Sequence, residues 1–295
     1  MRIIGFILIL FLSGFHLEAQ SNFQPYLGQE PPGLTPEVFA KGLISTNEFE
    51  FGSTFSKDGK TFHYAVDLGG YYEIRFSTWK NNKWSKPKVL LGDGKYTYND
   101  PMLNPREDRL YFISNRPMNG TGDAKDVDIW YVQRTLDGWS DPINVGAPIN
   151  TERNEYYMSF TSNGDMYFSS EKDDQGMRGN FNIYKSTLVN GEFQAPVMLP
   201  AEINGRGYEA DVFIAPDESY IIFAANRKSS LGSGDLYISF KQEDGTWTQS
   251  KNMGPSINNE TNPFCPFVSA DGKYLFYSSR SDIYWVSTKV FEALK

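Results

Sequence analysis

The sequence predicts an all-β fold: a single five-bladed β-propeller with four antiparallel strands per blade. Two observations support this prediction. One segment pattern occurs five times along the 295-residue chain, and aromatic residues make up 16% of it, which favours strands. Internal repeats with a period of about 50 residues are typical of propeller blades.

Each repeat begins with a hairpin, in which an apolar residue, a turn-rich tetrapeptide and an apolar-aromatic run follow one another. Asp-Gly or Asn-Gly between apolar runs is a strong signal for a hairpin. The copies read FSKDGKTFHY from Phe55, LNPREDRLYF from Leu103, FTSNGDMYF from Phe160, IAPDESYIIF from Ile214 and VSADGKYLFY from Val268. Spacings of 48, 57, 54 and 54 residues separate the equivalent turn residues Asp58, Arg106, Asn163, Asp217 and Asp271.

Two further strands follow each hairpin. The third strand has a β-branched and aromatic centre, as in YYEIRFS at Tyr71, DIWYV at Asp128, NIYKS at Asn182, DLYIS at Asp235 and DIYWV at Asp282. The fourth has a turn, an aromatic residue and usually a proline, which an edge strand tolerates. Its copies are NNKWSKPKVL from Asn81, DGWSDPINVG from Asp137, NGEFQAPVML from Asn190 and DGTWTQSKNMG from Asp244.

The fifth repeat lacks this outer strand, and the missing piece occurs near the N-terminus. PEVFAKGLIST from Pro36 matches PINVGAPINT from Pro142. We therefore expect the N-terminal segment to supply the outer strand of the last blade and to close the ring, which removes exposed strand edges. The alternative is that residues 20–47 form a loose tail.

The expected organisation has three parts. Residues 1–19 form a signal peptide, 20–35 an N-terminal extension and 36–295 the propeller. The blades are expected near residues 48–92, 97–150, 153–204, 207–258, and 260–295 plus 36–47.

The first residues are typical of a secretory signal: Arg2 precedes an apolar run from Ile3 to Leu12, and small residues surround a cleavage position near Ala19. A membrane anchor is the alternative, but the run is short and no stop-transfer pattern follows it. No later segment is long and apolar enough to cross a membrane. We expect an exported protein, periplasmic or secreted.

Composition excludes several classes of function. The net charge of −8 argues against nucleic acid or a phospholipid surface as partner. One cysteine, Cys265, and two histidines exclude a disulfide framework and make a zinc site unexpected. No cofactor is expected. Calcium is an alternative at the loop Gly120–Asp128, although the spacing of its aspartates differs from an EF-hand and Lys125 interrupts them.

The hairpin core, a following Ser-x-Arg element and the DIY strand resemble WD40-like β-propeller repeats of the type found in the Tol-system periplasmic propeller. The Ser-x-Arg element is Ser114-Asn115-Arg116, Ala225-Asn226-Arg227 and Ser278-Ser279-Arg280. The resemblance covers about Pro36 to Val286 and implies the architecture. It implies little about function, because propellers support many functions.

A candidate site lies on the face of the disc with the longer connections. Strand directions alternate, so Pro117–Val127, Lys172–Asn180 and Lys228–Gly234 share one face, and such loops often carry function. The inner strands begin at that face with acidic and aromatic residues. The candidate binding residues at the channel mouth are Glu50, Asp100, Glu155, Glu209, Asp211, Tyr98, Tyr156 and Tyr208. Alternatively, these residues hold adjacent blades together.

Three arginines belong to the same candidate set. Arg116, Arg227 and Arg280 each precede an aspartate at the start of the third strand: Asp128, Asp235 and Asp282. One interpretation is an Arg–carboxylate fork that braces the loop. The other is recognition of an anionic ligand.

Known catalytic motifs of nucleophilic, zinc or phosphate-binding enzymes are missing from the sequence. The sequence therefore favours a monomeric, non-enzymatic propeller that binds a protein or an envelope or extracellular glycan through its long-loop face. The alternative is a carboxylate-dependent glycan hydrolase or lyase at the central channel, with Glu50, Asp100, Glu155 and Glu209 as candidate acids. A scaffold role in an envelope complex is a third possibility.

Overall fold

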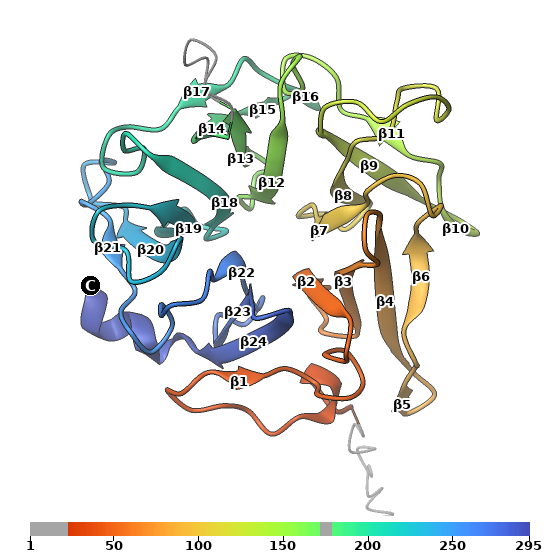
Figure 1. The fold of residues 1–295 in the computed structure, drawn as a ribbon, viewed down its shortest axis with the longest axis horizontal. Coiled ribbons are helices and arrows are strands. Elements are labelled where there is room, and N and C mark those ends of the chain that lie inside the picture. The colour runs from red at the N-terminus through yellow and green to blue at the C-terminus, as the bar shows by residue number, and fades with distance from the viewer. Residues whose placement is uncertain (1–22, 172–178) are drawn as a thin grey trace, which may run out of the picture.

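The computed structural model describes residues 23–171 and 179–295. Five antiparallel sheets surround a central axis (Figure 1), which confirms the predicted all-β, five-bladed propeller. The predicted signal peptide (1–19) and residues 172–178 of the predicted long loop lie outside the described residues. Among the described residues, no helix has the length and apolar character needed to cross a membrane.

The strands of each blade are ordered from the axis outward. Blade 1 contains β2 (Phe49–Phe55), β3 (Thr61–Asp67), β4 (Tyr72–Lys80) and β6 (Lys88–Leu91). Blade 2 contains β7 (Asn99–Leu103), β8 (Arg109–Ser114), β9 (Asp128–Thr135) and β11 (Ile143–Asn144). Blade 3 contains β12 (Glu155–Phe160), β13 (Met166–Glu171), β14 (Phe181–Ser186) and β17 (Val197–Met198).

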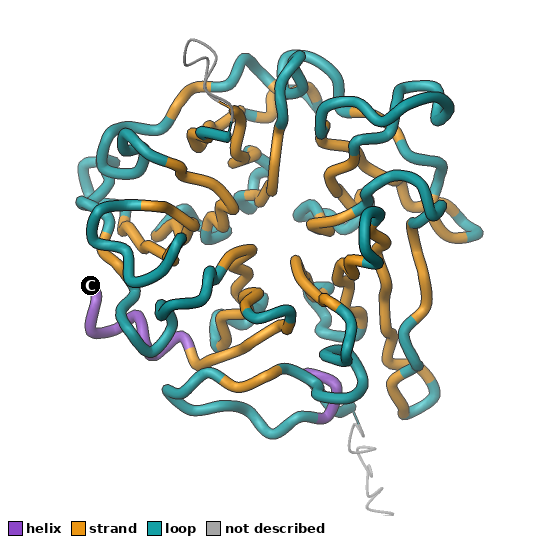
Figure 2. Tube along the Cα trace, in the orientation of Figure 1, coloured by secondary structure: helices purple, strands orange, loops and turns teal. Residues whose placement is uncertain are grey.

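Blade 4 contains β18 (Tyr208–Ile214), β19 (Tyr220–Asn226), β20 (Asp235–Phe240) and β21 (Lys251–Asn252). Blade 5 contains β22 (Phe264–Val268), β23 (Tyr274–Ser279), β24 (Asp282–Ser287) and β1 (Glu37–Val38). Short elements extend the blades at β5 (Lys83–Trp84), β10 (Gly138–Trp139), β15 (Leu188–Val189) and β16 (Glu192–Phe193). Helical turns occur only as η1 (Tyr26–Gly28) and η2 (Thr288–Leu294) in the described residues (Figure 2).

In three of the five blades, the outer strand begins directly after a proline. Pro87, Pro142 and Pro196 immediately precede β6, β11 and β17. Proline has no backbone N–H to donate, so it is suited to the start of an edge strand. The predicted turn-aromatic segment is separate from the outer strand and forms the small extensions β5 and β10 and the hairpin β15–β16.

The N-terminal segment closes the ring, as the sequence predicts. In β1, Glu37 pairs with Trp285 and Val38 with Tyr284 of β24. The next residue, Phe39, donates its backbone N–H to the Ile283 carbonyl at 2.7 Å. Its buried ring packs against four aromatic rings of blades 1 and 5, with centroids 5.1–6.0 Å away. Closure therefore combines a short strand pair with an aromatic anchor.

Residues 23–35 also pack on this seam. The Tyr26 ring contacts Phe55 of blade 1 and Tyr274 of blade 5, at centroid distances of 5.7 and 5.0 Å. The Trp84 indole N–H donates to the Gln24 carbonyl at 2.8 Å. The segment thus contacts both blades that meet at the closure.

The links between blades are fixed by a repeated asparagine. Asn150 accepts the backbone N–H of Ile129 and donates its side-chain amide to the Ile129 carbonyl, at 2.9 and 2.8 Å. Asn204 and Asn258 make the same pair of bonds to β14 and β20. The side-chain amide of each asparagine therefore pairs with the third strand as the backbone of an outer strand would. In this way it holds the link to the next blade in place.

Ion pairs add a further contact between blades 3 and 4. Glu218, in the turn between β18 and β19, lies 2.6 Å from the Lys185 ammonium and 2.8 Å from that of Lys241. The Tyr167 hydroxyl donates to the same carboxylate at 2.5 Å. These partners hold the pKa of Glu218 at about 2, against the opposing effect of its partial burial.

Candidate functional site

The site is built from an irregularity repeated in every inner strand. β2, β7, β12, β18 and β22 surround the centre of the disc (Figure 1), and each contains a register shift against its neighbour. A bulge bends the strand and re-aims a side chain. The residues at these bulges all have positive φ: Gly52 (48°), Asp100 (53°), Tyr157 (37°), Asp211 (52°) and Cys265 (50°).

These bulge residues meet on the axis, although they come from different blades. The Cys265 thiol donates to Asp100 Oδ1 at 3.3 Å. A Cβ added to Gly52 would lie 2.6 Å from the same oxygen. Glycine at this position therefore makes room for the Asp100 carboxyl group, and its missing side chain also suits the positive φ.

Burial changes the acidity of the two axial carboxyl groups. Asp100 is buried, and burial followed by repulsion from Asp211 raises its pKa from 3.8 to about 8. Burial likewise raises the pKa of Asp211 to about 7, while the Cys265 backbone opposes that rise. Removal of a carboxylate from water disfavours its charged form. Asp100 is therefore largely neutral at pH 7 and Asp211 about half neutral, and a neutral carboxyl group both donates and accepts hydrogen bonds.

Aromatic rings surround these acids at the channel mouth. A cavity of about 310 Å³ opens there, at the face where the inner strands begin. The Tyr156 ring stacks on Phe181 at 4.6 Å, and Tyr208 meets Phe181 edge-on at 5.7 Å. The lining residues, which come from all five blades, are Phe51, Tyr72, Thr97, Asn99, Asp100, Ile113, Asn115, Val127, Tyr156, Tyr208, Asp211, Phe264 and Cys265.

Tyr157 lies across the channel below this cavity. Its hydroxyl donates to the carbonyl of Pro266 at 2.8 Å, joining blade 3 to blade 5. Its side chain is buried, and burial raises its pKa well above the usual value. The hydrogen bond therefore joins two blades that are not neighbours in the ring.

Three other predicted acids have a different environment. Glu50 accepts from the Thr46 hydroxyl at 2.5 Å and from its backbone N–H at 3.2 Å. Glu155 accepts the equivalent pair from Thr151, at 2.8 and 3.1 Å. Glu209 lies 3.5 Å from the Arg227 guanidinium. All three are buried. Glu50 and Glu155 hold the links that precede β2 and β12, whereas the Arg227 partner of Glu209 lies in the same blade, directly after β19.

The predicted arginine forks form with other partners. The Arg116 guanidinium lies over the Trp130 ring, 4.9 Å from its centroid, while Asp128 pairs with Lys125 at 2.6 Å. Arg227 pairs with Glu209 instead of Asp235, and Arg280 lies 3.8 Å from Glu260. The predicted pairing with the following aspartate was therefore wrong. Lys125 pairs with Asp128, and Asp235 accepts the backbone N–H groups of Leu231 and Gly232.

The remaining candidate tyrosines also differ in role: some line the cavity and one braces a link between blades. Tyr156 and Tyr208 line the mouth, whereas the Tyr98 hydroxyl donates to Asp93 at 2.8 Å and braces the link before β7. Lys125 lies within the loop considered for calcium, paired to Asp126 and Asp128. Within residues 23–171 and 179–295, no group of three His, Cys, Asp or Glu side chains is arranged to hold a metal ion.

Sequence reasoning missed several residues of the site, among them Phe51, Tyr72 and Cys265. The axial contact of Cys265 with Asp100 was not foreseen. A signal was nevertheless available. Every bulge residue lies six positions before the turn residue of its own hairpin, so aligning the repeats places all five in one column.

Comparisons with known proteins support the fold. No protein-family model and no curated protein sequence matches the chain. Among solved structures, an endo-arabinase from Bacteroides thetaiotaomicron VPI-5482 has a TM-score of 0.54 at 13% identity, covering 88% of this chain and 97% of that one. A gluconolactonase from Xanthomonas campestris has a TM-score of 0.50 at 12% identity, covering 88% and 96%.

TolB from Acinetobacter baumannii matches with a TM-score of 0.52 at 13% identity, covering 84% of this chain. The chain spans 56% of the length of that protein. At these identities the likeness shows a shared β-propeller fold. Function must then be argued from the site, because unrelated activities occur on this fold.

Proposed function

We propose that this protein is exported and binds a glycan at the mouth of its central channel, without catalysing a reaction. The observation that carries the proposal is the pair of buried axial carboxyl groups, whose raised pKa values favour their neutral forms, together with an aromatic surround. Asp100 and Asp211 lie on the axis, and Tyr156, Tyr208 and Phe264 line the cavity above them. This arrangement suits an uncharged, polyhydroxylated ligand.

Each part of a sugar has a matching group in this cavity. The C–H faces of a sugar ring pack on aromatic rings. Its hydroxyl groups exchange hydrogen bonds with neutral carboxyl groups and with side-chain amides, which both donate and accept. Asn99 and Asn115 supply such amides in the lining. A bare cation would instead require charged carboxylates, which burial disfavours here.

Glycan binding is tested by titration calorimetry against a panel of soluble envelope and plant polysaccharides. We expect at least one ligand to bind, and Tyr156→Ala to weaken its binding about fivefold or more, because an aromatic ring that packs on a ligand ring supplies about 1 kcal/mol or more. Tyr131→Ala is the matched control, since Tyr131 lies half-buried in β9 away from the lining. A protein retained from the native envelope through Tyr156, with no glycan bound, would replace the glycan proposal by protein binding.

One observation favours a second function, carboxylate-dependent hydrolysis or lysis of a glycan. Burial raises the pKa of both groups and repulsion from Asp211 adds to the rise at Asp100, which leaves pKa values near 8 for Asp100 and near 7 for Asp211. In such a pair one group holds a proton while the other is charged, as acid–base catalysis at a glycosidic bond requires. Release of reducing ends from any polysaccharide in the panel, abolished by Asp211→Asn, would establish this function and refute the non-enzymatic proposal.

A further inference from the structure

A second cavity occupies the opposite end of the channel, at the face that carries the hairpin turns. Its volume is about 180 Å³, and its lining residues come from all five blades. None of them lines the channel-mouth cavity. We infer that this second cavity is a separate binding site for a small ligand that combines an apolar ring with one anionic group.

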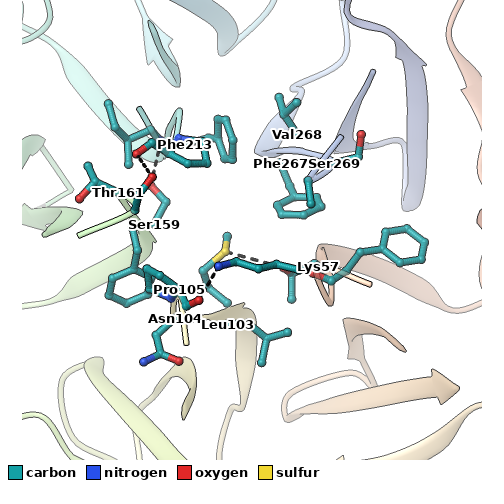
Figure 3. Close-up of a pocket in the computed structure, with 18 of the residues that line it drawn as sticks. Lys57, Leu103, Asn104, Pro105, Ser159, Thr161, Phe213, Phe267, Val268 and Ser269 are labelled. Atoms are coloured by element: carbon teal, nitrogen blue, oxygen red, sulfur yellow. Dashed lines mark hydrogen bonds between the residues drawn. The ribbon is translucent and has the colours of Figure 1, made fainter. Parts of the chain in front are cut away.

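The interior of the cavity is apolar because of the register of the inner strands. Two positions after each bulge, the side chain again faces the axis. The residues at these positions are Thr54, Met102, Ser159, Phe213 and Phe267. Figure 3 shows Ser159, Phe213 and Phe267 around the cavity, and the rings of Phe213 and Phe267 meet edge-on at 6.1 Å.

The two hydroxyl groups in this set are already used within the protein. Ser159 donates to the Val212 carbonyl at 2.8 Å and accepts the Ile214 N–H at 3.0 Å. Thr54 donates to the Met102 sulfur at 3.8 Å. The cavity therefore offers little to a polar guest. An apolar cavity of about 150 Å³ is large enough to bind benzene in another protein, so a ring-sized guest suits the space.

A single ammonium group lies over the cavity. The Lys57 side chain extends across it toward blade 2 (Figure 3), where Nζ donates to the Pro105 carbonyl at 2.5 Å. None of the ion pairs formed within the described segments includes Lys57. The carboxylate of Glu107, also on the rim, accepts a hydrogen bond from the backbone N–H of Lys57 at 2.5 Å.

This geometry is the reason why we expect the ligand to carry an anionic group. An ammonium group has three donors, and the neutral Pro105 carbonyl takes one of them. A ligand carboxylate at the rim would accept another, forming a charge-assisted hydrogen bond while its ring fills the space below. Lys57 is exposed, so the contribution of this contact is modest and the apolar interior supplies most of the affinity.

The test uses two probes that differ only at the polar end: naphthalene-2-carboxylate and naphthalene-2-methanol. We expect both to bind the purified protein in calorimetry, the carboxylate about fivefold more tightly. Lys57→Met should remove that preference without abolishing binding. Met102→Trp, which fills the cavity, should abolish binding of both probes. Tyr156→Ala, in the other cavity, should change neither affinity, which keeps this site distinguishable from the proposed glycan site.

Three results would overturn the inference: no binding of either probe at millimolar concentration, an unchanged preference in Lys57→Met, or unchanged binding in a folded Met102→Trp protein. Circular dichroism and the melting temperature report whether Met102→Trp folds. If it does not, Phe213→Ala decides, because enlarging the cavity must shift the preference toward a larger ring, such as phenanthrene carboxylate. Unchanged ring selectivity in Phe213→Ala would then reject the site.

Discussion

Replacement of Asp100 by asparagine should stabilise the protein at neutral pH and should do so increasingly as the pH rises. The folded-state pKa of Asp100, about 8, lies above the usual value of 3.8. Between those values the folded protein keeps a proton that the unfolded chain releases. The free energy of unfolding therefore falls as the pH rises through this window. The asparagine side chain does not titrate in this range. It has nearly the same shape as aspartate, and asparagine also tolerates a positive φ.

The size of the effect follows from the shift. Each pH unit inside the window costs about 1.4 kcal/mol, so at pH 7 the asparagine variant recovers up to about 4 kcal/mol relative to the original protein. Near pH 4 the carboxyl group is protonated in the folded state and half-protonated when unfolded, so the two proteins should differ little there. Relaxation around the carboxyl group and its coupling to Asp211 make this an upper limit.

The assay is urea unfolding of both proteins at several pH values between about 4 and 8. Other shifted groups, such as His63, whose pKa burial lowers to about 3, are common to both proteins, so the difference between the curves isolates Asp100. Parallel curves across this range would refute the reasoning. So would a variant that is less stable at every pH, because that would mean a charged, well-solvated Asp100.

Three further predictions concern the scaffold. Glu218→Gln should lower the free energy of unfolding by about 1 kcal/mol at pH 7, and the deficit, measured by urea unfolding, should shrink as the pH falls from about 4.5 toward 2, because the unfolded chain takes up the proton first and the folded protein only near pH 2. Gly52→Ala should destabilise by more than Gly94→Ala: both glycines have positive φ, but only Gly52 faces an atom within 4 Å; equal losses in melting temperature would contradict the close approach to Asp100. Phe39→Ala should cost about 3–5 kcal/mol by chemical denaturation, whereas Leu34→Ala, 59% exposed, should change stability little; similar effects would argue against the aromatic anchor.

The architecture could be predicted from the sequence because its determinants are local and repeated. The hairpin turns recur at nearly constant spacing, and PEVFAKGLIST matches an outer-strand segment closely enough to predict the pairing of β1 with β24. Each repeat alone is ambiguous between a hairpin and an isolated turn. Five copies restrict the interpretation to one architecture, since each unit can bury its apolar face only against its neighbours.

The division of the acidic residues was not predicted, although the aligned repeats place Asp100 and Asp211 in a different column from Glu50, Glu155 and Glu209. Glu50 and Asp100 both stand near the start of an inner strand, yet one turns to Thr46 and the other to the axis. The difference depends on the bulge, which reverses the facing of a side chain within a strand that otherwise alternates. The raised pKa of Asp100 depends further on burial by residues from other blades, which no single repeat contains.

The partners of the arginines also depended on distances that sequence does not give. The sequence suggested that Arg116 pairs with Asp128. In the structure the Lys125 ammonium group pairs with that carboxylate instead, at 2.6 Å. The flat guanidinium then stacks on the Trp130 ring, a contact that suits its delocalised charge. Competition among nearby charges, rather than spacing along the chain, determined these pairs.

The pairing of β1 with β24 also sets the order in which the molecule can be completed. A chain is made from its N-terminus, so residues 37–38 emerge before blades 1 to 4, whereas their partners Tyr284 and Trp285 emerge after them. Blades 1 to 4 contain their own strands and can form as the chain lengthens. The fifth sheet cannot be finished until Tyr284 and Trp285 are available. Its completion therefore requires a contact between segments far apart in the sequence, of the kind that slows folding.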